Sequence, residues 1–141
     1  MSHKIPKNIR EQVRRRAKFL CEYCHTNERW QYVRFTIDHI LPNEDNSIEN
    51  LALACFHCNR RKSNKTSIFD EKFNREIPLF NPRRDLWSEH FAWSEDKIYV
   101  VPKTEIGRVT SDLLELNRDR ILHIRLADVA VNRHPPNKDS A

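Results

Sequence analysis

Apolar and polar positions alternate at recognisable periods in the first half of the chain. Apolar side chains recur at helical spacing within 6–18, while most arginines of that segment lie at other positions, which predicts a helix. β-forming residues across 31–40 and the apolar run 51–54 predict two strands around a polar loop. The basic stretch 59–65 predicts a short helix. The expected order is therefore helix, strand, loop, strand, helix.

The second half shows clear periods only toward its end. Residues 66–86 carry two prolines and no period, so we expect an irregular connection there. The segments 91–93 and 98–101 flank a polar tetrapeptide and predict a hairpin. Thr104 is a suitable cap for a following amphipathic helix, and 118–131 predicts a last one.

Charge is distributed unevenly along the 141 residues. The chain carries 25 Lys plus Arg against 20 Asp plus Glu, a formal net charge of +5. Residues 1–65 hold 13 basic and 7 acidic side chains (+6), whereas 66–141 hold 12 and 13 (−1). This excess in the first half favours a polyanionic partner such as nucleic acid. No apolar stretch approaches the length of a membrane span or of a signal peptide, so we expect no membrane association and a cytoplasmic location.

The four cysteines form two Cys-x-x-Cys pairs. The pairs are Cys21 with Cys24 and Cys55 with Cys58. This spacing is typical of knuckles that together bind one tetrahedral Zn²⁺, and a reducing cytosol argues against disulfides. Unrelated buried or reactive cysteines are the alternative, which the matched spacing disfavours. Four thiolates leave no open coordination position, so the predicted zinc is structural.

Several chemically capable side chains lie between and just after the knuckles. Asp38 and His39 end the first predicted strand, Asn50 precedes the second, and Asn59 and Lys62 follow Cys58. An isolated Asp-His pair is commonly a hydrogen-bonded structural pair. Its position beside two zinc knuckles and two asparagines favours catalysis instead.

These residues resemble a known family. Ile37-Asp38-His39-Ile40-Leu41-Pro42, Ile48-Glu49-Asn50-Leu51 and Cys55-x-x-Cys58-Asn59-x-x-Lys62 are similar to the zinc-knuckle branch of the HNH endonucleases, over residues 18–66. Asn59 stands where the family's letters place a second histidine, a variation the family also shows. The resemblance implies an α+β fold: a ββα-metal HNH core held by the four-cysteine zinc site, with an N-terminal helix and a C-terminal lobe of hairpin and helices.

The resemblance and the residue types together assign roles. His39 is expected to take a proton from water, and Asn50 to orient its ring. Asp38 and Asn59 offer oxygen ligands that suit a catalytic Mg²⁺ or Mn²⁺ better than zinc. Basic side chains on the two helices are expected to contact phosphates, although an arginine run is commonly a solvated helix face. These are Arg60, Arg61, Lys62, Lys65, Arg14 and Arg15.

The expected activity is metal-dependent hydrolysis of DNA phosphodiesters by an HNH endonuclease. DNA is preferred because the family mostly cuts it, although no residue excludes RNA. One alternative is a zinc-knuckle nucleic-acid-binding protein without catalysis. Another is an interaction module that recruits a partner through the C-terminal helices.

The two halves are expected to form two parts, a nuclease core over 1–66 and an accessory lobe over 67–141. The lobe is expected to pack on the core, where it would shape the substrate groove or mediate a homodimer. Its residue His90 lies in an aromatic segment, which favours a place in the core over one near the substrate. Trp30 and Tyr32 could stack on bases, but packing is the preferred interpretation.

Overall fold

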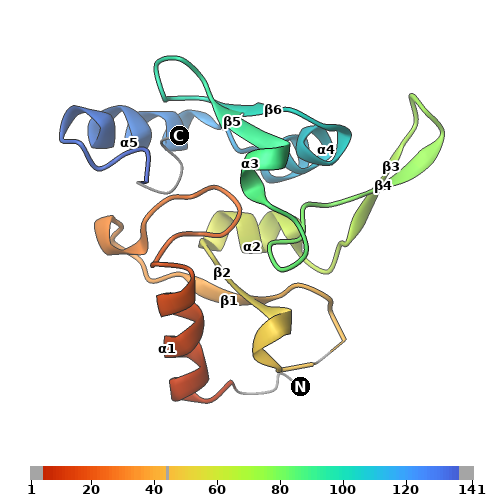
Figure 1. The fold of residues 1–141 in the computed structure, drawn as a ribbon, viewed down its shortest axis with the longest axis horizontal. Helices are drawn as coiled ribbons and strands as arrows, with labels where there is room; N and C mark the ends of the chain where they lie inside the picture. Colours follow the sequence, from red (N-terminus) through yellow and green to blue (C-terminus); the bar gives the residue numbers. More distant parts are fainter. Residues whose placement is uncertain (1–4, 44, 137–141) are drawn as a thin grey trace. The chain divides into compact units, whose positions relative to one another are not determined.

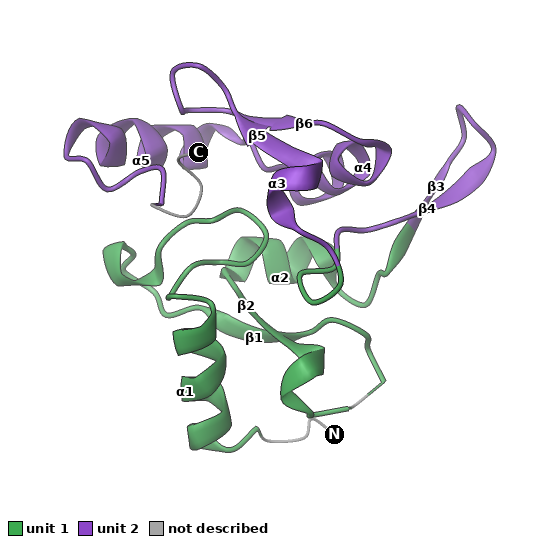
Figure 2. Ribbon diagram, in the orientation of Figure 1, with its two compact units in different colours: residues 1–67, 81–84 green, residues 68–80, 85–141 purple. Residues whose placement is uncertain are grey.

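A computed structural model describes residues 5–43 and 45–136 and divides the chain into two compact units (Figure 2). Unit 1 comprises residues 1–67 and 81–84, and unit 2 comprises 68–80 and 85–141. The division lies one residue after the predicted boundary between 66 and 67. The short segment 81–84 belongs with unit 1, which the sequence does not predict.

Unit 1 is built around a two-stranded antiparallel sheet. Strand β1 pairs with β2 so that Asp38 faces Ala52 and His39 faces Leu51. Figure 1 shows α1 and α2 on opposite sides of this pair. The elements of unit 1 are α1 (Lys7–Arg16), the 3-10 turn η1 (Glu28–Trp30), β1 (Thr36–His39), the 3-10 turn η2 (Ile48–Asn50), β2 (Leu51–Ala54) and α2 (Phe56–Lys62).

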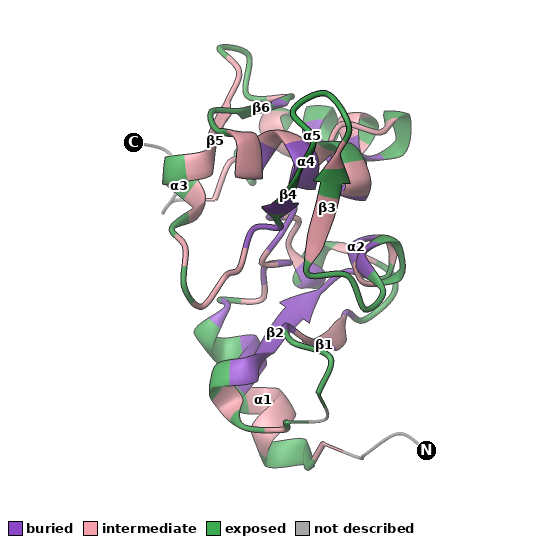
Figure 3. Cartoon of the chain, turned by 90° about the vertical axis from the view of Figure 1, so that its right-hand side faces the viewer, coloured by how far each residue is buried: buried purple, intermediate pink, exposed green. Residues whose placement is uncertain are grey.

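The core of unit 1 centres on β2, whose four residues are all fully buried (Figure 3). A strand covered on both faces is expected to be apolar at every position rather than at alternate ones, which explains the uninterrupted run Leu51–Ala54. Val13 of α1 and Phe35 before β1 are also buried. The strand that carries His39 is thus held by a packed neighbour.

The predicted ββα order is confirmed, with two differences in bounds. The strand predicted over 31–40 begins only at Thr36, because the backbone N–H of Phe35 donates to the Glu28 carboxylate instead of a strand partner. Helix α2 starts at Phe56, before Cys58, because the Cys55 sulfur accepts from the Cys58 N–H and caps the helix. The second cysteine knuckle therefore also forms the N-terminus of α2.

Within its described part, unit 2 contains three helices and two strand pairs, β3 with β4 and β5 with β6. The β5–β6 hairpin and the Thr104 cap, which accepts from the Gly107 N–H at 3.0 Å, are confirmed. The irregular connection predicted over 66–86 is wrong in part, because β3 and β4 pair there. The elements are β3 (Ser67–Asp70), β4 (Arg75–Pro78), α3 (Trp87–His90), β5 (Phe91–Trp93), β6 (Val100–Pro102), α4 (Glu105–Leu114) and α5 (Asp119–Ala130).

The single glycine of the chain has a packing reason in unit 2. A Cβ at Gly107 would lie 2.2 Å from the backbone oxygen of His90, so only glycine allows α4 to approach α3 this closely. His90 itself is half-buried and its Nδ1 lies 2.7 Å from the Thr104 hydroxyl. Within the described ranges, no helix is long and apolar enough to span a membrane.

Candidate metal centre and catalytic strand

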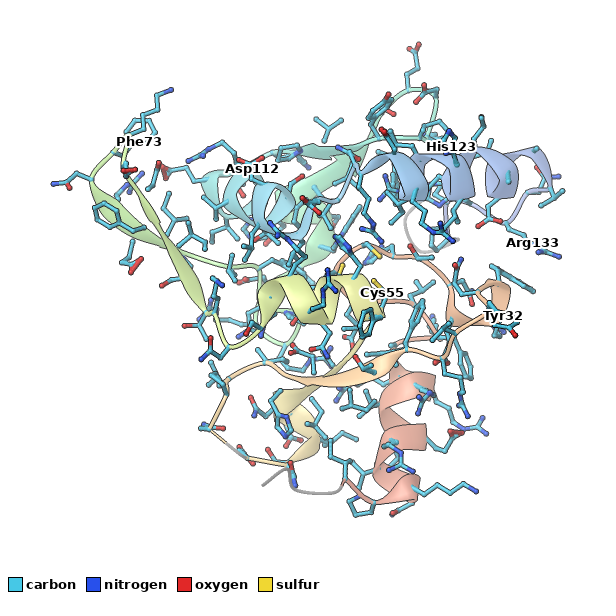
Figure 4. All side chains as sticks on the ribbon, turned by 180° about the vertical axis from the view of Figure 1, so that it is seen from behind. Tyr32, Cys55, Phe73, Asp112, His123 and Arg133 are labelled. Atoms are coloured by element: carbon cyan, nitrogen blue, oxygen red, sulfur yellow. The ribbon has the colours of Figure 1, made fainter. Side chains whose placement is uncertain are left out.

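The four cysteines converge as the sequence predicts. All four are buried, and their sulfur atoms lie within 4.8 Å of one another. The sulfurs of Cys24 and Cys55 are 3.8 Å apart. A tetrahedral site with metal–sulfur bonds of about 2.3 Å has sulfur–sulfur edges of about 3.8 Å, so the cluster fits Zn²⁺. Among the described residues it is the one group of at least three His, Cys, Asp or Glu side chains placed to hold a metal (Figure 4, near Cys55).

The cluster needs a cation to be stable as thiolates. Burial, with the neighbouring thiols, raises the pKa of the Cys21 thiol well above its usual range, whereas hydrogen bonds with the other three thiols lower the pKa of Cys24. The backbone N–H groups of Cys24 and Cys58 each lie 3.4 Å from the first sulfur of their own knuckle, as donors to it. A bound Zn²⁺ would supply the charge that these weak donors do not.

The first knuckle is fixed to the central strand through Glu22. Its backbone N–H donates to the Leu53 oxygen at 2.8 Å, and its carboxylate accepts from the Leu53 N–H, also at 2.8 Å. The same carboxylate pairs with Arg83, from the segment that returns to unit 1. Because Glu22 directly follows the zinc ligand Cys21, zinc binding also helps to fix the position of β2.

Asp38 lies in a buried charge network. Its Oδ2 accepts from the Tyr23 hydroxyl at 2.8 Å and lies 3.2 Å from the Lys62 ammonium. Both side chains of the ion pair are only 3% exposed. Lys62 also donates to the backbone oxygens of His39 at 3.3 Å and Ile40 at 3.2 Å. Lys62 thus ties α2 to the end of the strand that carries the histidine.

This network bears on the expected catalytic cation. Burial raises the pKa of Asp38, and the Lys62 ammonium and Tyr23 hydroxyl offset part of that rise. A carboxylate already compensated by a buried ammonium does not fit a hydrated Mg²⁺ or Mn²⁺ in this arrangement, since Lys62 and Tyr23 already contact its buried oxygens. Asn59 is half-buried on α2, three residues before Lys62 and so on the same side of the helix.

His39 ends β1 and is partly exposed. Its Nε2 lies 2.7 Å from the side-chain oxygen of Asn46. An amide oxygen can only accept, so with this side-chain orientation Nε2 carries the ring proton and Nδ1 keeps a free lone pair. The arrangement leaves one ring nitrogen able to take a proton.

Asn50 acts on the loop before it rather than on the ring. Its amide oxygen accepts from the Leu41 N–H at 2.9 Å, and its amide nitrogen donates to the backbone oxygens of Leu41 and Asp45 and to the Asn43 side chain. The buried amide therefore organises the loop that carries Asn46. The residue that contacts the His39 ring is Asn46, which sequence spacing alone did not identify.

The basic residues divide into buried and exposed sets. Lys62 and Arg14 are buried, and Arg14 pairs with Glu28 at 3.3 Å and donates to the Phe35 oxygen at 3.0 Å. Neither presents its charge to solvent, so both correct the expectation of a phosphate contact. The exposed members of the predicted set are Arg15, Arg60, Arg61 and Lys65.

Tyr23, Asn46 and Glu28 are the site residues that sequence reasoning missed. Tyr23 lies between two zinc ligands, and its hydroxyl reaches Asp38, fifteen residues away. The sequence does place Tyr23 between two predicted zinc ligands. A side chain at that position is expected to be buried, so its hydroxyl needs a hydrogen-bond partner. Asn46 and Glu28 carried no comparable signal, because their partners depend on how two loops close.

Comparison with known proteins agrees with this geometry. Residues 21–65 match the family model described as HNH endonuclease. The chain is 30% identical over 137 aligned positions to the Septu protein PtuA of Bacillus mycoides (strain KBAB4), a match that covers 74% of this chain and 18% of that protein. The chain thus spans less than a fifth of that relative. No solved structure matches significantly.

The segment that matches the family model contains both cysteine knuckles, the β1–β2 pair and the helix α2 that follows it. Residues 21–65 therefore form an HNH domain, in a mixed α+β chain whose four cysteines are placed to hold a metal ion.

Proposed function

We propose that this protein is an HNH endonuclease that hydrolyses phosphodiester bonds of DNA. The observation that carries the proposal is the His39 ring, which stands at the end of β1 in the HNH domain with Nε2 bonded to Asn46. Nε2 is thereby fixed as a donor, and Nδ1 is the candidate base.

In the proposed reaction the His39 Nδ1 takes a proton from a water molecule while the oxygen of that water forms a bond to phosphorus. The bond from phosphorus to the departing oxygen breaks, and that oxygen takes a proton from solvent water. The family resemblance implies 5′-phosphate and 3′-hydroxyl products. His39 is the catalytic residue in this scheme, and Asn46 is a positioning residue that sets its tautomer.

Lys62 and Asn50 support the backbone at the residue that carries the base and at the next one. Lys62 holds the backbone oxygens of His39 and Ile40, and the Asn50 backbone oxygen accepts from the Ile40 N–H at 2.9 Å. Two independent anchors on consecutive residues fix the backbone from which the ring projects. Both are positioning residues, and neither is proposed to touch the substrate.

The substrate is proposed to lie along the exposed face of α2. Arg60 and Arg61 are exposed on this helix and Lys65 is exposed just after it, and each can neutralise a phosphate. This contact gives affinity without base specificity, since arginine and lysine bind backbone phosphates of any sequence.

The divalent cation expected at Asp38 and Asn59 stays a prediction. When bound, such an ion supplies positive charge to the phosphate and its departing oxygen. The Lys62–Asp38 pair does not fit it as arranged, so we derive no step through it. Its requirement is tested by activity in added Mg²⁺ or Mn²⁺ against metal-depleted buffer, with zinc content measured in both.

The test of the proposed function is nicking of supercoiled plasmid by the zinc-loaded full chain. The His39→Ala variant should lose at least about a hundredfold in rate, the usual contribution of a general base. His57→Ala is the matched control, because it removes a histidine of the second knuckle that is no member of the four-cysteine set. A wild-type protein that binds DNA and never cuts it would favour the non-catalytic zinc-knuckle binding protein.

A further inference from the structure

Residues 29–34, here called the aromatic loop, expose large apolar side chains. Tyr32 is 103% exposed, Val33 62% and Trp30 42%. The sequence favours packing over base stacking for both rings; this is wrong for Tyr32, which lies wholly in solvent, while Trp30 is partly exposed. Figure 4 labels Tyr32 on this loop. The loop contains the last two residues of η1 and the segment that leads to β1, and its exposed apolar side chains are close together in sequence, as in surfaces that bind a partner.

The aromatic loop is anchored at both ends by buried polar groups. The Glu28 N–H donates to the Phe19 oxygen at 2.7 Å, and the Glu28 carboxylate accepts from the Phe35 N–H at 2.6 Å. Arg14, which is buried, pairs with the same carboxylate at 3.3 Å. These contacts of Glu28, here called the neck of the loop, hold its two ends together. The exposed rings are therefore carried by a loop with fixed ends.

The charge of the aromatic loop indicates which partner it suits. Its two charged side chains, Arg29 and Arg34, are both positive and exposed. The Arg29 guanidinium lies over the rings of Phe19 at 5.0 Å and Trp30 at 5.6 Å. Arg34 is 71% exposed and lies 3.8 Å from the Glu11 carboxylate and 4.0 Å from the buried Glu28 carboxylate, so most of its guanidinium still faces solvent. Cations interleaved with exposed aromatic rings match a polyanion that carries flat bases.

We propose that the aromatic loop is a stacking platform for unpaired bases of the nucleic acid that the HNH domain acts on. Trp30 and Tyr32 stack on bases, while Arg29 and Arg34 face phosphates. Bases within an intact duplex hide their faces, so the platform selects single-stranded or locally opened substrate. The inference rests on the proposed function for its choice of partner and adds the substrate form to it.

The test is binding to a single-stranded oligodeoxynucleotide of about 12 nucleotides with a central 2-aminopurine, and to the same strand annealed in a duplex. The zinc-loaded full chain carries His39→Ala to prevent cleavage. Adding Trp30→Ala and Tyr32→Ala should weaken single-strand binding at least about 25-fold, since one stacked ring contributes at least about fivefold. Duplex affinity should change less than about twofold, and the 2-aminopurine quenching should disappear.

Two controls separate stacking from general loss of surface. Trp30→Phe with Tyr32→Phe keeps two rings and should retain the quenching and most of the affinity. Phe69→Ala removes another exposed ring, 52% exposed in unit 2, and should leave binding unchanged.

The outcomes distinguish the platform from the proposed nuclease. If the double alanine variant binds the single strand as tightly as its parent, the platform is overturned and the rings are left for a protein partner, while the nuclease proposal stands. If the parent binds neither single strand nor duplex, the proposed function itself fails and the platform fails with it.

Discussion

Replacing Lys62 by methionine should destabilise unit 1 strongly, although lysine is usually a surface residue. The ammonium lies 3.2 Å from the Asp38 carboxylate, and both side chains are 3% exposed. Removing one partner of a buried ion pair leaves an uncompensated charge, which costs about 3–5 kcal/mol. We expect Lys62→Met to lower the free energy of unfolding by that amount at pH 7, a large share of a domain's usual stability.

The effect should be reversed by neutralising the partner. In Lys62→Met with Asp38→Asn, no buried charge remains, so most of the loss should return. Lys65→Met, on the same basic segment but exposed, should change stability by less than about 0.5 kcal/mol. The assay is urea denaturation of the zinc-loaded chain, followed by circular dichroism, for the two single variants, the double variant and the control.

The pH dependence gives an independent check. The pKa of Asp38 is raised in the folded state by burial, while Lys62 lowers it. A carboxyl whose folded pKa exceeds its unfolded value binds more protons when folded, so its contribution to stability falls as pH rises above about 4 toward the folded pKa. Without Lys62 that window extends to higher pH, and Lys62→Met should regain stability between pH 7 and pH 5.5 relative to the wild type. A loss below about 1 kcal/mol, or one that Asp38→Asn leaves unchanged, would refute the reasoning.

Three further predictions concern the metal, the aromatic loop's neck and the loop before Asn50. Zinc content by atomic emission should be one ion per chain and should fall in Cys24→Ser. Chelation should unfold unit 1, because structural zinc contributes about 10–16 kcal/mol to folding, and a chelated chain that keeps its circular dichroism spectrum would contradict this. Arg14→Met should cost about 3 kcal/mol in urea denaturation and Arg15→Met less than about 0.5, whereas equal losses would contradict the buried pairing of Arg14 with Glu28. Asn50→Ala removes an amide with four loop contacts, so it should cost about 2 kcal/mol or more and slow plasmid nicking; full activity at normal stability would show that the loop needs no such anchor.

Local patterns predicted much of the fold because their causes are local. The Cys-x-x-Cys spacing specifies a knuckle whatever lies between the pairs, and the Thr104 cap bonds a backbone group three residues away. The uninterrupted apolar run Leu51–Ala54 predicted a buried strand with correct bounds.

What the sequence did not predict depends on distant partners. Arg14 and Lys62 look like members of basic runs, and only the fold brings Glu28 and Asp38 to them, 14 and 24 positions away. The segment 31–35 has β-forming residues, yet its last backbone N–H goes to a carboxylate from η1. Trp30 and Tyr32 are residue types that are often buried, yet both lie outside the core. Whether a side chain is buried depends on which other residues fill the core.

Chemical rescue of His39→Ala by imidazole tests the central claim most directly. The substitution removes the ring from the end of β1 and leaves the zinc cluster and the Lys62 anchor in place. If His39 is the base, added imidazole should restore part of the plasmid nicking lost in the zinc-loaded variant, and should not stimulate the wild type or His57→Ala. A His39→Ala variant that nicks at the wild-type rate without imidazole would contradict the account.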